Sequence, residues 1–289
     1  RGMGVNNLRP DELDLAMHAL SAALEGGMQV IVARSFPLEE AADAHRAVAE
    51  RGKDGKIVLV SLALRMIYVT GDTHGSYRHV RAFAREHSLG PDVIVCLGDT
   101  GFDYFGDERD DAVKTRAARA GVTFLCIRGN RDRNPATLAD YRLQPWRGGE
   151  AYVDPAYPTL LLARDGSVFD LEGRSAIAIG GAYSVDKRHR LANGHLWFPD
   201  EQLTEAEKEH VEQALDRRHW RIDTVLSHTC PAAFVPQEAL LQSTVDTSME
   251  DWLQRIEQRL RYRRWYCGHF HIEKQEGRLR FLHKDIVPL

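Results

Sequence analysis

Three apolar runs of the sequence end alike, with a glycine followed by a side chain that carries a ligand oxygen. The runs cover 66–71, 93–98 and 122–128, and the side chains that follow the glycines are Asp72, Asp99 and Asn130. Helical patterns at about 76–87 and 107–120 separate the runs, so strands alternate with helices and predict βαβ units in a parallel sheet. Ligands bind beyond the carboxyl ends of such strands, and glycine permits a sharp exit of the backbone there. We therefore expect these three side chains to converge.

Four histidines follow strand-like runs in the same manner. His74 lies two residues beyond Asp72, "VLSHT" places His228 after a strand, and "CGHFH" does the same for His269 and His271. Carboxylate, amide and imidazole ligands suit divalent ions such as Mn, Fe, Zn, Co or Ni. Seven side chains exceed the four that one structural zinc needs, and they fit two ions about 3.5–4 Å apart with one bridging carboxylate. Each piece alone is ordinary turn chemistry, whereas the ordered set predicts a metal centre.

The order "GDTHG … GD … GN … SH … GHFH" resembles the calcineurin-like metallophosphoesterase superfamily, from Met66 to the C-terminus. The segments "GGAYSVDKRHR", "LWFPDEQL" and "HKDI" are similar to a group of small bacterial and phage-type members. The resemblance implies an α/β fold, a four-layer α/β/β/α sandwich over residues 66–289, with a dinuclear metal site at the strand ends. Between 134 and 157 the sequence is rich in loop signals.

The resemblance also implies a role for each ligand. Asp72, His74 and His271 would bind the first ion, Asp99 would bridge, and Asn130, His228 and His269 would bind the second. The implied activity is hydrolysis of a small-molecule phosphoester by a hydroxide held between two divalent cations. Manganese is the expected ion, and iron, zinc, cobalt, nickel and magnesium are alternatives.

One position departs from the family pattern. The family motif is Gly-Asn-His followed by an acid, whereas this chain has Arg131 between Asn130 and Asp132. Arginine stays charged and cannot protonate a leaving group, but it can hold a phosphate oxygen with two donors. We expect Arg131, Asp132 and Asp99 to form the catalytic group, with Arg131 paired to Asp132. Without a general acid, the enzyme should prefer phosphodiesters or activated monoesters as substrates. In the alternative, Arg131 faces solvent and His189 or His195 serves instead.

The segment "GAYSVDKRHR" carries the candidate substrate contacts. Tyr183, Lys187 and Arg190, with Asp186 beside them, are expected to line the substrate side, and the alternative is a solvated charge cluster. Asp103 lies one position late for the Asp-Arg-Gly motif of the protein phosphatases, so we assign it no metal role.

The sequence predicts that residues 1–65 form a separate, small α-β-α-β extension, with its first helix at 11–25, where apolar residues recur at helical spacing. Residues 8–60, with "PLEEAADAH" and "GKIVLV", resemble the C-terminal end of zinc-type medium-chain alcohol dehydrogenases and quinone reductases. No G-x-G-x-x-G follows a strand, so we expect no nicotinamide site and no dehydrogenase activity. We expect packing or self-association instead, which makes a homo-oligomer through 1–65 a candidate assembly.

Composition narrows the other function classes. The net charge is −4, and no apolar run reaches the roughly 18 residues of a transmembrane helix. We expect a cytoplasmic protein with no membrane partner, which meets nucleic acid only as a substrate. The four cysteines form no CxxC pair and are expected to be reduced and buried. The rival to an enzyme is a metal-binding scaffold or regulatory module with little turnover.

Overall fold

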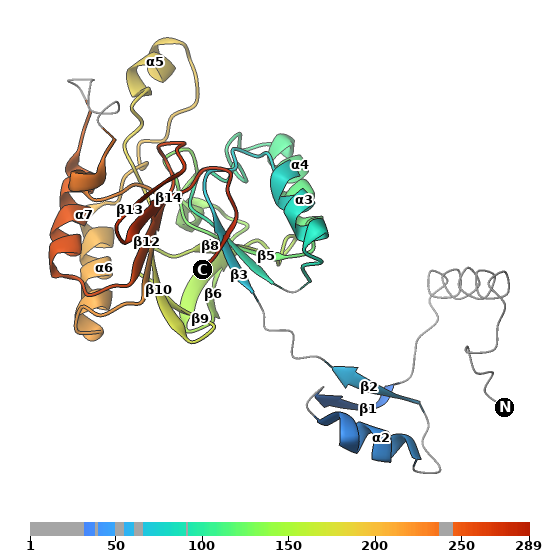
Figure 1. The fold of residues 1–289 in the computed structure, drawn as a ribbon. Helices are drawn as coiled ribbons and strands as arrows, with labels where there is room; N and C mark the ends of the chain where they lie inside the picture. The colour runs from blue at the N-terminus through green and yellow to red at the C-terminus, as the bar shows by residue number, and fades with distance from the viewer. Residues whose placement is uncertain (1–31, 38–39, 50–54, 61–65, 91, 237–244) are drawn as a thin grey trace. The chain divides into compact units, whose positions relative to one another are not determined.

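Two β-sheets lie face to face in the larger of the two units into which the chain divides, Arg65–Leu289 (Figure 1). The computed structural model describes residues 32–37, 40–49, 55–60, 66–90, 92–236 and 245–289. Within these ranges the larger unit carries every residue that the sequence assigned to the metal centre. The smaller unit is Arg1–Leu64.

The first sheet has seven strands. Their order is β15 (Val287–Pro288), β3 (Ile67–Thr70), β4 (Val93–Cys96), β5 (Thr123–Cys126), β8 (Leu160–Ala163), β7 (Gly149–Val153) and β6 (Arg142–Trp146). Strands β3, β4, β5 and β8 are parallel, as the alternation of strands and helices predicted. In β4, Val93 and Val95 pack toward the second sheet and Ile94 and Cys96 toward the helices, which explains why the whole run is apolar.

The second sheet has six strands. Their order is β13 (Lys274–Glu276), β14 (Leu279–Phe281), β12 (Arg264–Cys267), β11 (Thr224–Ser227), β10 (Arg174–Ile179) and β9 (Val168–Leu171). Strands β10, β11, β12 and β14 are parallel, and β9 and β13 are antiparallel edge strands. The two central strands β11 and β12 therefore deliver their carboxyl ends side by side.

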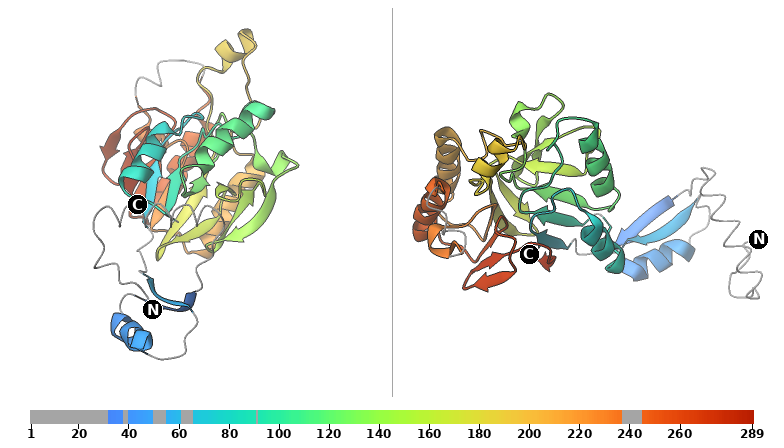
Figure 2. Two further views of the ribbon diagram at one scale, coloured as in Figure 1. Left: turned by 90° about the vertical axis from the view of Figure 1, so that its right-hand side faces the viewer. Right: turned by 90° about the horizontal axis from the view of Figure 1, so that it is seen from above.

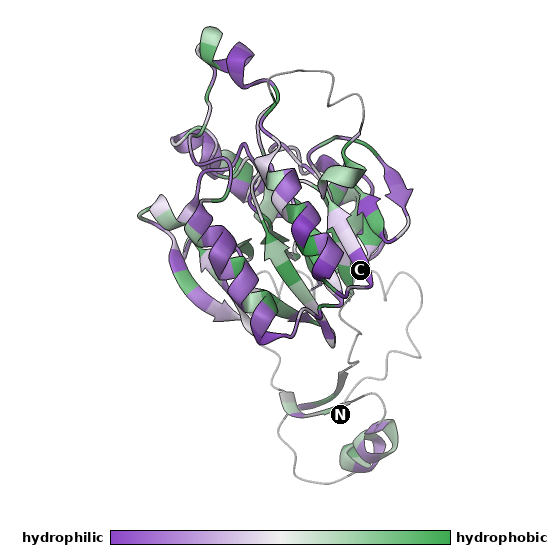
Figure 3. Ribbon diagram, turned by 90° about the vertical axis from the view of Figure 1, so that its left-hand side faces the viewer, coloured by the Kyte–Doolittle hydropathy of each residue, from purple (hydrophilic) through white to green (hydrophobic). Residues whose placement is uncertain are grey.

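Helices cover the outer face of each sheet, which completes the four layers (Figure 2). The helices α3 (Arg78–Glu86) and α4 (Glu108–Ala118) pack on the first sheet, and α6 (Glu205–Arg217) and α7 (Ser248–Arg259) on the second. Hydrophobic strands lie behind helices whose outward turns are hydrophilic (Figure 3). The predicted α/β/β/α sandwich is confirmed. None of the helices in the described ranges is long and apolar enough to cross a bilayer.

The prediction of a loop-rich stretch between 134 and 157 is wrong in its second half. After the short 3-10 helix η3 (Pro135–Thr137), strands β6 and β7 form an antiparallel hairpin. Strand β6 is an exposed edge strand that contains Pro145, so it lacks the apolar alternation that marks a strand. Arg147 and Gly148 both have positive φ in the turn, a conformation typical of two-residue hairpin loops.

Two short helices lie between the regular elements of the second sheet. Helix α5 (Lys187–Ala192) projects from the body between β10 and α6, and the 3-10 helix η4 (Ala232–Phe234) follows β11 (Figure 1). The sequence analysis predicted neither, because segments of six and three residues carry little helical periodicity.

The smaller unit contains a βαβ element. Strands β1 (Val32–Pro37) and β2 (Lys56–Val60) pair in parallel, and α2 (Ala41–Ala49) connects them. Its core is small, with Phe36, Ala44 and Ala47 buried and Ile57 packed against them. The helix expected at 11–25 lies outside the described residues.

Candidate metal centre

All seven candidate ligands follow the carboxyl ends of parallel strands. Asp72 and His74 follow β3, Asp99 follows β4, Asn130 follows β5, His228 follows β11, and His269 and His271 follow β12. Contacts between side chains up to 199 positions apart in the chain join the ends of the two sheets. The structure therefore brings all seven together at one end of the sandwich.

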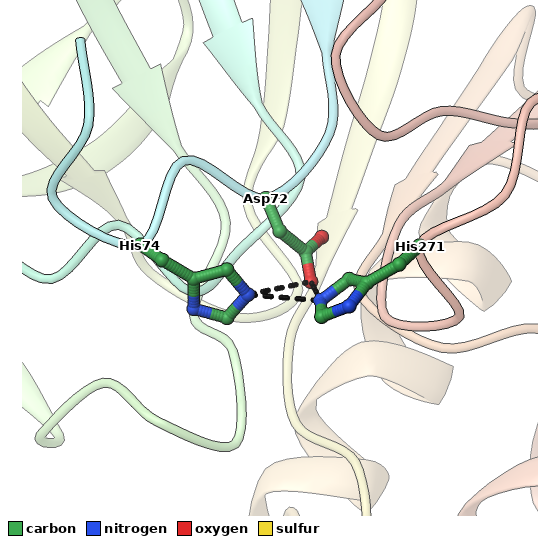
Figure 4. A group of neighbouring side chains, drawn as sticks. All are labelled: Asp72, His74 and His271. Atoms are coloured by element: carbon green, nitrogen blue, oxygen red, sulfur yellow. Dashed lines mark hydrogen bonds and ion pairs between the residues drawn. The ribbon is translucent and has the colours of Figure 1, made fainter.

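Three of these residues form what we call the outer group, Asp72, His74 and His271 (Figure 4). The Nε2 atom of His271 lies 3.1 Å from Oδ2 of Asp72 and 2.8 Å from Nε2 of His74. Nε2 of His74 lies 3.8 Å from the same Asp72 oxygen. Two ring nitrogens and one carboxylate oxygen thus face a common point. The side chains of His74 and His271 are 31% and 43% exposed, so solvent reaches this point.

The other four residues form the inner group, Asp99, Asn130, His228 and His269. Oδ1 of Asn130 lies 2.9 Å from Nε2 of His228 and 3.2 Å from Nδ1 of His269. Asn130 donates through Nδ2 to Oγ of Ser184 at 2.8 Å, which turns its oxygen toward the histidines. The side chain of His228 is fully buried. Its Nδ1 lies 2.6 Å from the carbonyl oxygen of Leu97, an acceptor only, so Nδ1 carries the proton and Nε2 is left as a ligand.

Asp99 belongs to the inner group and also faces the outer group. One of its carboxylate oxygens is 3.6 Å from Nε2 of His228, and the other is 3.8 Å from Nδ1 of His74. The backbone N–H of Arg131 donates to Asp99 at 2.8 Å, and the backbone N–H of His269 donates to Asp72 at 3.0 Å. The ligand atoms of Asp72, Asp99 and His228 lie within 4.8 Å of one another. These positions suit a carboxylate shared by two ions.

The glycines before the ligands have a reason that the sequence analysis missed. Among the glycines that precede ligands, Gly71, Gly98, Gly129 and Gly268, only Gly98 has a positive φ, of 109°. A backbone exit that requires glycine therefore occurs after one run alone. At Gly129 a Cβ atom would overlap the carboxylate of Asp99, and at Gly268 it would overlap that of Asp72. A Cβ atom at Gly98 would also overlap the ring of His228. Gly98, Gly129 and Gly268 therefore clear the space into which a ligand from another strand end fits, whereas a Cβ atom at Gly71 would overlap the backbone of Leu282.

The ligands themselves carry unusual backbone conformations. Nine described residues other than glycine have positive φ, and four of them are the candidate ligands His74, Asp99, His269 and His271, with φ between 45° and 64°. Such angles are uncommon outside glycine, and strained backbone of this kind clusters at functional sites. The loops therefore hold these four side chains in directions that an extended strand end would not give.

Burial shapes the electrostatics of the two carboxylates differently. Burial raises the pKa of Asp99 to about 7, and the nearby carboxylates of Asp72 and Asp132 add to the effect. Burial also acts to raise the pKa of Asp72, but the hydrogen bond with His271, together with the one from the backbone N–H of His269, outweighs it and brings the pKa to about 2. Loss of hydration lowers the pKa of His269 to about 3 and that of His74 to about 4, so both rings are neutral at pH 7.

These properties fit a pair of divalent cations. Asp72 and Asp99 bring two buried carboxylates close together, which is unfavourable unless positive charge lies between them. Neutral imidazoles, carboxylates and one amide oxygen are donors that first-row divalent ions accept. The outer group with Asp99 would hold one ion, and the inner group would hold the other.

The predicted pairing of Arg131 with Asp132 is wrong. The guanidinium of Arg131 donates to Asp186 at 3.1 Å, and its Nε lies 3.8 Å from Oδ2 of Asp99. Asp132 is buried and accepts hydrogen bonds from the backbone N–H groups of Thr100, Gly101 and Gly129. Asp132 therefore ties the loop after β4 to the loop after β5, which fixes Asp99 and Asn130 relative to each other.

The predicted substrate contacts divide into two kinds. Arg190 is buried and donates to Asp186, to the hydroxyl of Tyr104 and to the carbonyl of Leu196, so its donors are used inside the protein. These contacts hold Arg190 inside the protein, and a contact with substrate stays a prediction. Lys187 lies over the ring of Trp197 at 4.1 Å and over that of Tyr183 at 5.5 Å. Both Lys187 and Tyr183 are partly exposed, as a substrate contact requires.

Two other expectations concern nearby groups. His189 and His195 are exposed in and after α5 and stack on each other, with ring centroids 6.0 Å apart. No described contact joins either of them to the seven ligands. Asp103 accepts hydrogen bonds from Lys114 at 3.0 Å and from Tyr141 at 2.5 Å.

Two residues that support the centre were not predicted from the sequence: Ser184 orients Asn130, and Tyr104 joins Arg190 beside the ligand loops. Asp186, expected at the substrate side, holds Arg131. Ser184 and Asp186 lie in "GAYSVDKRHR", which was singled out, but its spacing does not say which side chain turns toward the ligands. Tyr104 had no local signal.

Comparisons with known proteins place the chain in a family. A family model described as calcineurin-like phosphoesterase matches residues 66–273, and one described as zinc-binding dehydrogenase matches residues 5–59. No curated protein is similar enough in sequence to count as a match.

Two solved structures are similar at low identity. The crystal structure of TT1561 of Thermus thermophilus is 14% identical in sequence and has a TM-score of 0.45. The match covers 76% of this chain and 88% of the TT1561 chain. The phosphopantetheinyl hydrolase PptH of Mycobacterium tuberculosis is 16% identical, covers 75% and 88%, and has a TM-score of 0.36. Since the first family model spans most of the sequence, this chain belongs to the calcineurin-like phosphoesterases and is a metal-dependent hydrolase of phosphoric esters.

Proposed function

We propose that the protein hydrolyses phosphodiesters, or monoesters with acidic leaving groups, at two divalent cations. The outer group together with Asp99 binds one cation, and the inner group, which includes Asp99, binds the other. Bound cations would activate water for attack on phosphorus and take up negative charge on the phosphoryl oxygens. Manganese is the ion we propose first, because the donor set mixes hard oxygens with imidazoles.

The observation that carries the diester preference is the guanidinium of Arg131 beside Asp99. Its side chain is 33% exposed, close enough to Asp99 to reach a phosphoryl group there and open enough to meet one. Arginine cannot give up a proton at any relevant pH, so it stabilises phosphoryl charge without protonating a leaving alkoxide. General acid help is worth roughly 10²–10⁴-fold for poor leaving groups. Diesters with acidic leaving groups need it least.

The other residues of the chain position the reaction. Asp186 holds the guanidinium of Arg131, and Asp132 fixes the two loops that carry Asp99 and Asn130. His228 keeps its Nε2 directed inward because its Nδ1 donates to Leu97. Lys187 and Tyr183 would meet the far side of the substrate, where a second ester arm or a phosphoryl oxygen lies.

A panel of two substrates and four cations tests the proposal. Hydrolysis of bis(4-nitrophenyl) phosphate and of an alkyl phosphate monoester is measured with Mn²⁺, Zn²⁺, Mg²⁺ and Ni²⁺. We expect the wild type to prefer the diester by at least about 100-fold, the lower end of what a general acid contributes. Arg131→His, which restores the family residue, should narrow that gap by raising monoester turnover. Arg188→His is the matched control, since Arg188 is exposed on α5.

Three outcomes would contradict the proposal. A wild type that prefers the alkyl monoester would remove the role assigned to Arg131. Activity that survives chelation would contradict a metal-dependent reaction. No activity with any of the four cations would favour the alternative of a metal-binding scaffold over a diesterase.

For the smaller unit we propose self-association. Its described sheet has two strands, and its described core is limited to a few side chains around Phe36, too little for a unit that is stable alone. Contact with a second copy would cover strand edges and apolar surface. Light scattering of the full chain over a hundredfold range of concentration tests this, and a monomer throughout would count against it. The proposal assigns no catalytic role to residues 1–65.

A further inference from the structure

A cavity of about 260 Å³ opens beside the metal centre on the side of helix α4. Its lining includes His74, Asp99 and Arg131, the groups that would face a bound phosphoryl group, and the two glycines Gly75 and Gly101. The remaining lining residues are Tyr104, Phe105 and Val113, which we call its walls. A lining that combines polar and apolar groups is typical of a site that binds one part of a ligand by charge and another by shape.

The walls of this cavity are held in place by contacts outside it. The hydroxyl of Tyr104 accepts a hydrogen bond from Arg190 at 3.0 Å, and its ring meets Phe105 edge to face with centroids 5.0 Å apart. The guanidinium of Arg109 lies 3.9 Å from the centroid of the Phe105 ring. Asp110, at the start of α4, accepts from the backbone N–H of Phe105 at 3.0 Å. A pocket fixed in this way is formed before substrate binds, so little binding energy is lost in ordering it.

The size of the cavity limits what can enter. A sealed cavity of roughly 150 Å³ in another protein holds benzene, so 260 Å³ admits one substituted aromatic ring or a ring pair. A long acyl chain or a run of nucleotides would not fit. The ionisable lining groups other than Tyr104 are the cationic Arg131 and the proposed ligands His74 and Asp99, so an aromatic group without positive charge is favoured. Edge-to-face contact with Tyr104 or Phe105 would add to the burial of such a ring.

We infer that the Tyr104–Phe105–Val113 pocket binds an uncharged aromatic ester arm of the phosphodiester, the arm that stays on phosphorus. This inference rests on the proposed function, since it names the substrate class for the same site. Arg131 and the cations would hold the phosphoryl group beside the metal centre, and the ring would extend toward α4. In the reaction, water forms the new P–O bond and gives up a proton to solvent. The other arm departs as an oxyanion with the electrons of its P–O bond, and the aromatic monoester is released.

Two substrates that share a leaving group isolate the retained arm. Bis(4-nitrophenyl) phosphate and methyl 4-nitrophenyl phosphate both release 4-nitrophenol, and they differ in whether a ring or a methyl group remains. One methylene more or less in a hydrophobic pocket is worth roughly 10–200-fold in kcat/KM, and a ring is much larger than one methylene. We expect the wild type to prefer the bis ester by at least about 10-fold after correction for the two equivalent leaving groups and for their uncatalysed rates.

Variants of the walls should remove that preference. Phe105→Ala opens the pocket and Val113→Phe fills it, and both should bring the two substrates within about 3-fold of each other while the methyl ester changes little. Ala112→Phe is the matched control, because Ala112 is the exposed neighbour of Val113 on α4. Val113 is buried in the core, so Val113→Phe could fail to fold. In that case Phe105→Ala alone tests whether the pocket binds the retained arm.

Binding separates failure of the pocket from failure of the proposed function. If the wild type hydrolyses neither diester, the proposed function has failed. Calorimetry with diphenyl phosphate and dimethyl phosphate then tests the pocket alone. Tighter binding of the diphenyl ester that Phe105→Ala abolishes supports the inference. Equal affinity for the two, or an aryl preference in hydrolysis or binding that survives Phe105→Ala, overturns it.

Discussion

The outer and inner groups of the metal centre use the same kinds of ligand, but their surroundings differ. In the outer group, His74 and His271 are about one third or more exposed, and their ring nitrogens touch each other and Asp72. In the inner group, His228 is fully buried and Asp99 nearly so, and Leu97 and Ser184 hold His228 and Asn130 from behind. An inner cation should therefore meet a preformed, dry site, and an outer cation should exchange with solvent.

The largest expected effect comes from removing the residue that the two groups share. Asp99→Ala should reduce kcat by more than about 100-fold, because loss of residues that only support a ligand already costs 10–100-fold. Both cations should be weakened together. Activity and metal content per chain measure this, with the exposed Asp140→Ala as control. Loss of one cation alone would show that Asp99 does not serve both groups.

The next largest effect should follow from a single added carbon. In Gly129→Ala the new Cβ overlaps the carboxylate of Asp99, so the carboxylate must move. Displacement by about 1 Å can cost 100-fold in rate, and we expect a loss of that order. Gly90→Ala is the matched control, because a Cβ there meets nothing within 4 Å. Near-normal kcat in Gly129→Ala with unchanged circular dichroism would mean that the inner group tolerates more movement than we infer.

Rescue by excess cation should separate the two groups. In His74→Ala, water can replace the exposed imidazole, so we expect Mn²⁺ at high concentration to restore activity to within about 10-fold of the wild type. In His228→Ala, the loss is buried and Asn130 loses a partner, so excess Mn²⁺ should not restore activity. Titration of kcat with Mn²⁺ for both variants measures this. Equal rescue of the two would erase the distinction between the groups.

The smallest effect concerns the packing behind the inner group. Thr229, next to His228, donates to the buried carboxylate of Glu250 at 2.7 Å, and burial raises the pKa of Glu250 above its ordinary 4.5. The folded state therefore disfavours the ionised carboxylate, and stability falls as pH rises from 4.5 through the raised pKa. Glu250→Gln should lose this contribution, so its stability relative to the wild type should rise between pH 4.5 and 7. Urea unfolding at both pH values checks the sign.

Much of the fold could be predicted from the sequence because its strongest signals are periodic. The run of Val93–Cys96 is apolar on both faces since one face meets a second sheet and the other meets helices. The hairpin β6–β7 was not predicted, because its outer strand is exposed and contains Pro145. Its sequence therefore lacks the alternation of apolar and polar residues that a half-buried strand shows. The position of the seven ligands could be predicted from the strand ends, because parallel strands have their carboxyl ends at the same edge of a sheet.

What the sequence does not encode locally is the direction of each side chain within its loop. Arg131 and Asp132 are neighbours, yet one turns toward Asp186 and the other accepts backbone N–H groups from two loops. Arg190 looks like a surface charge in the sequence, but three partners from separate parts of its surroundings bury it. Such choices depend on tertiary contacts, which spacing along the chain does not reveal.

The left-handed backbone at four of the ligands limits how the centre can be redesigned or can drift in evolution. A β-branched replacement at His74, Asp99, His269 or His271 would lose the donor and also meet a steric penalty of about 1–2 kcal/mol in the loop itself. Asparagine and aspartate suffer least there, so oxygen donors are the accessible exchanges. A library meant to change cation preference would therefore yield more from Asn130 and His228, which lie outside that backbone region, than from the other four.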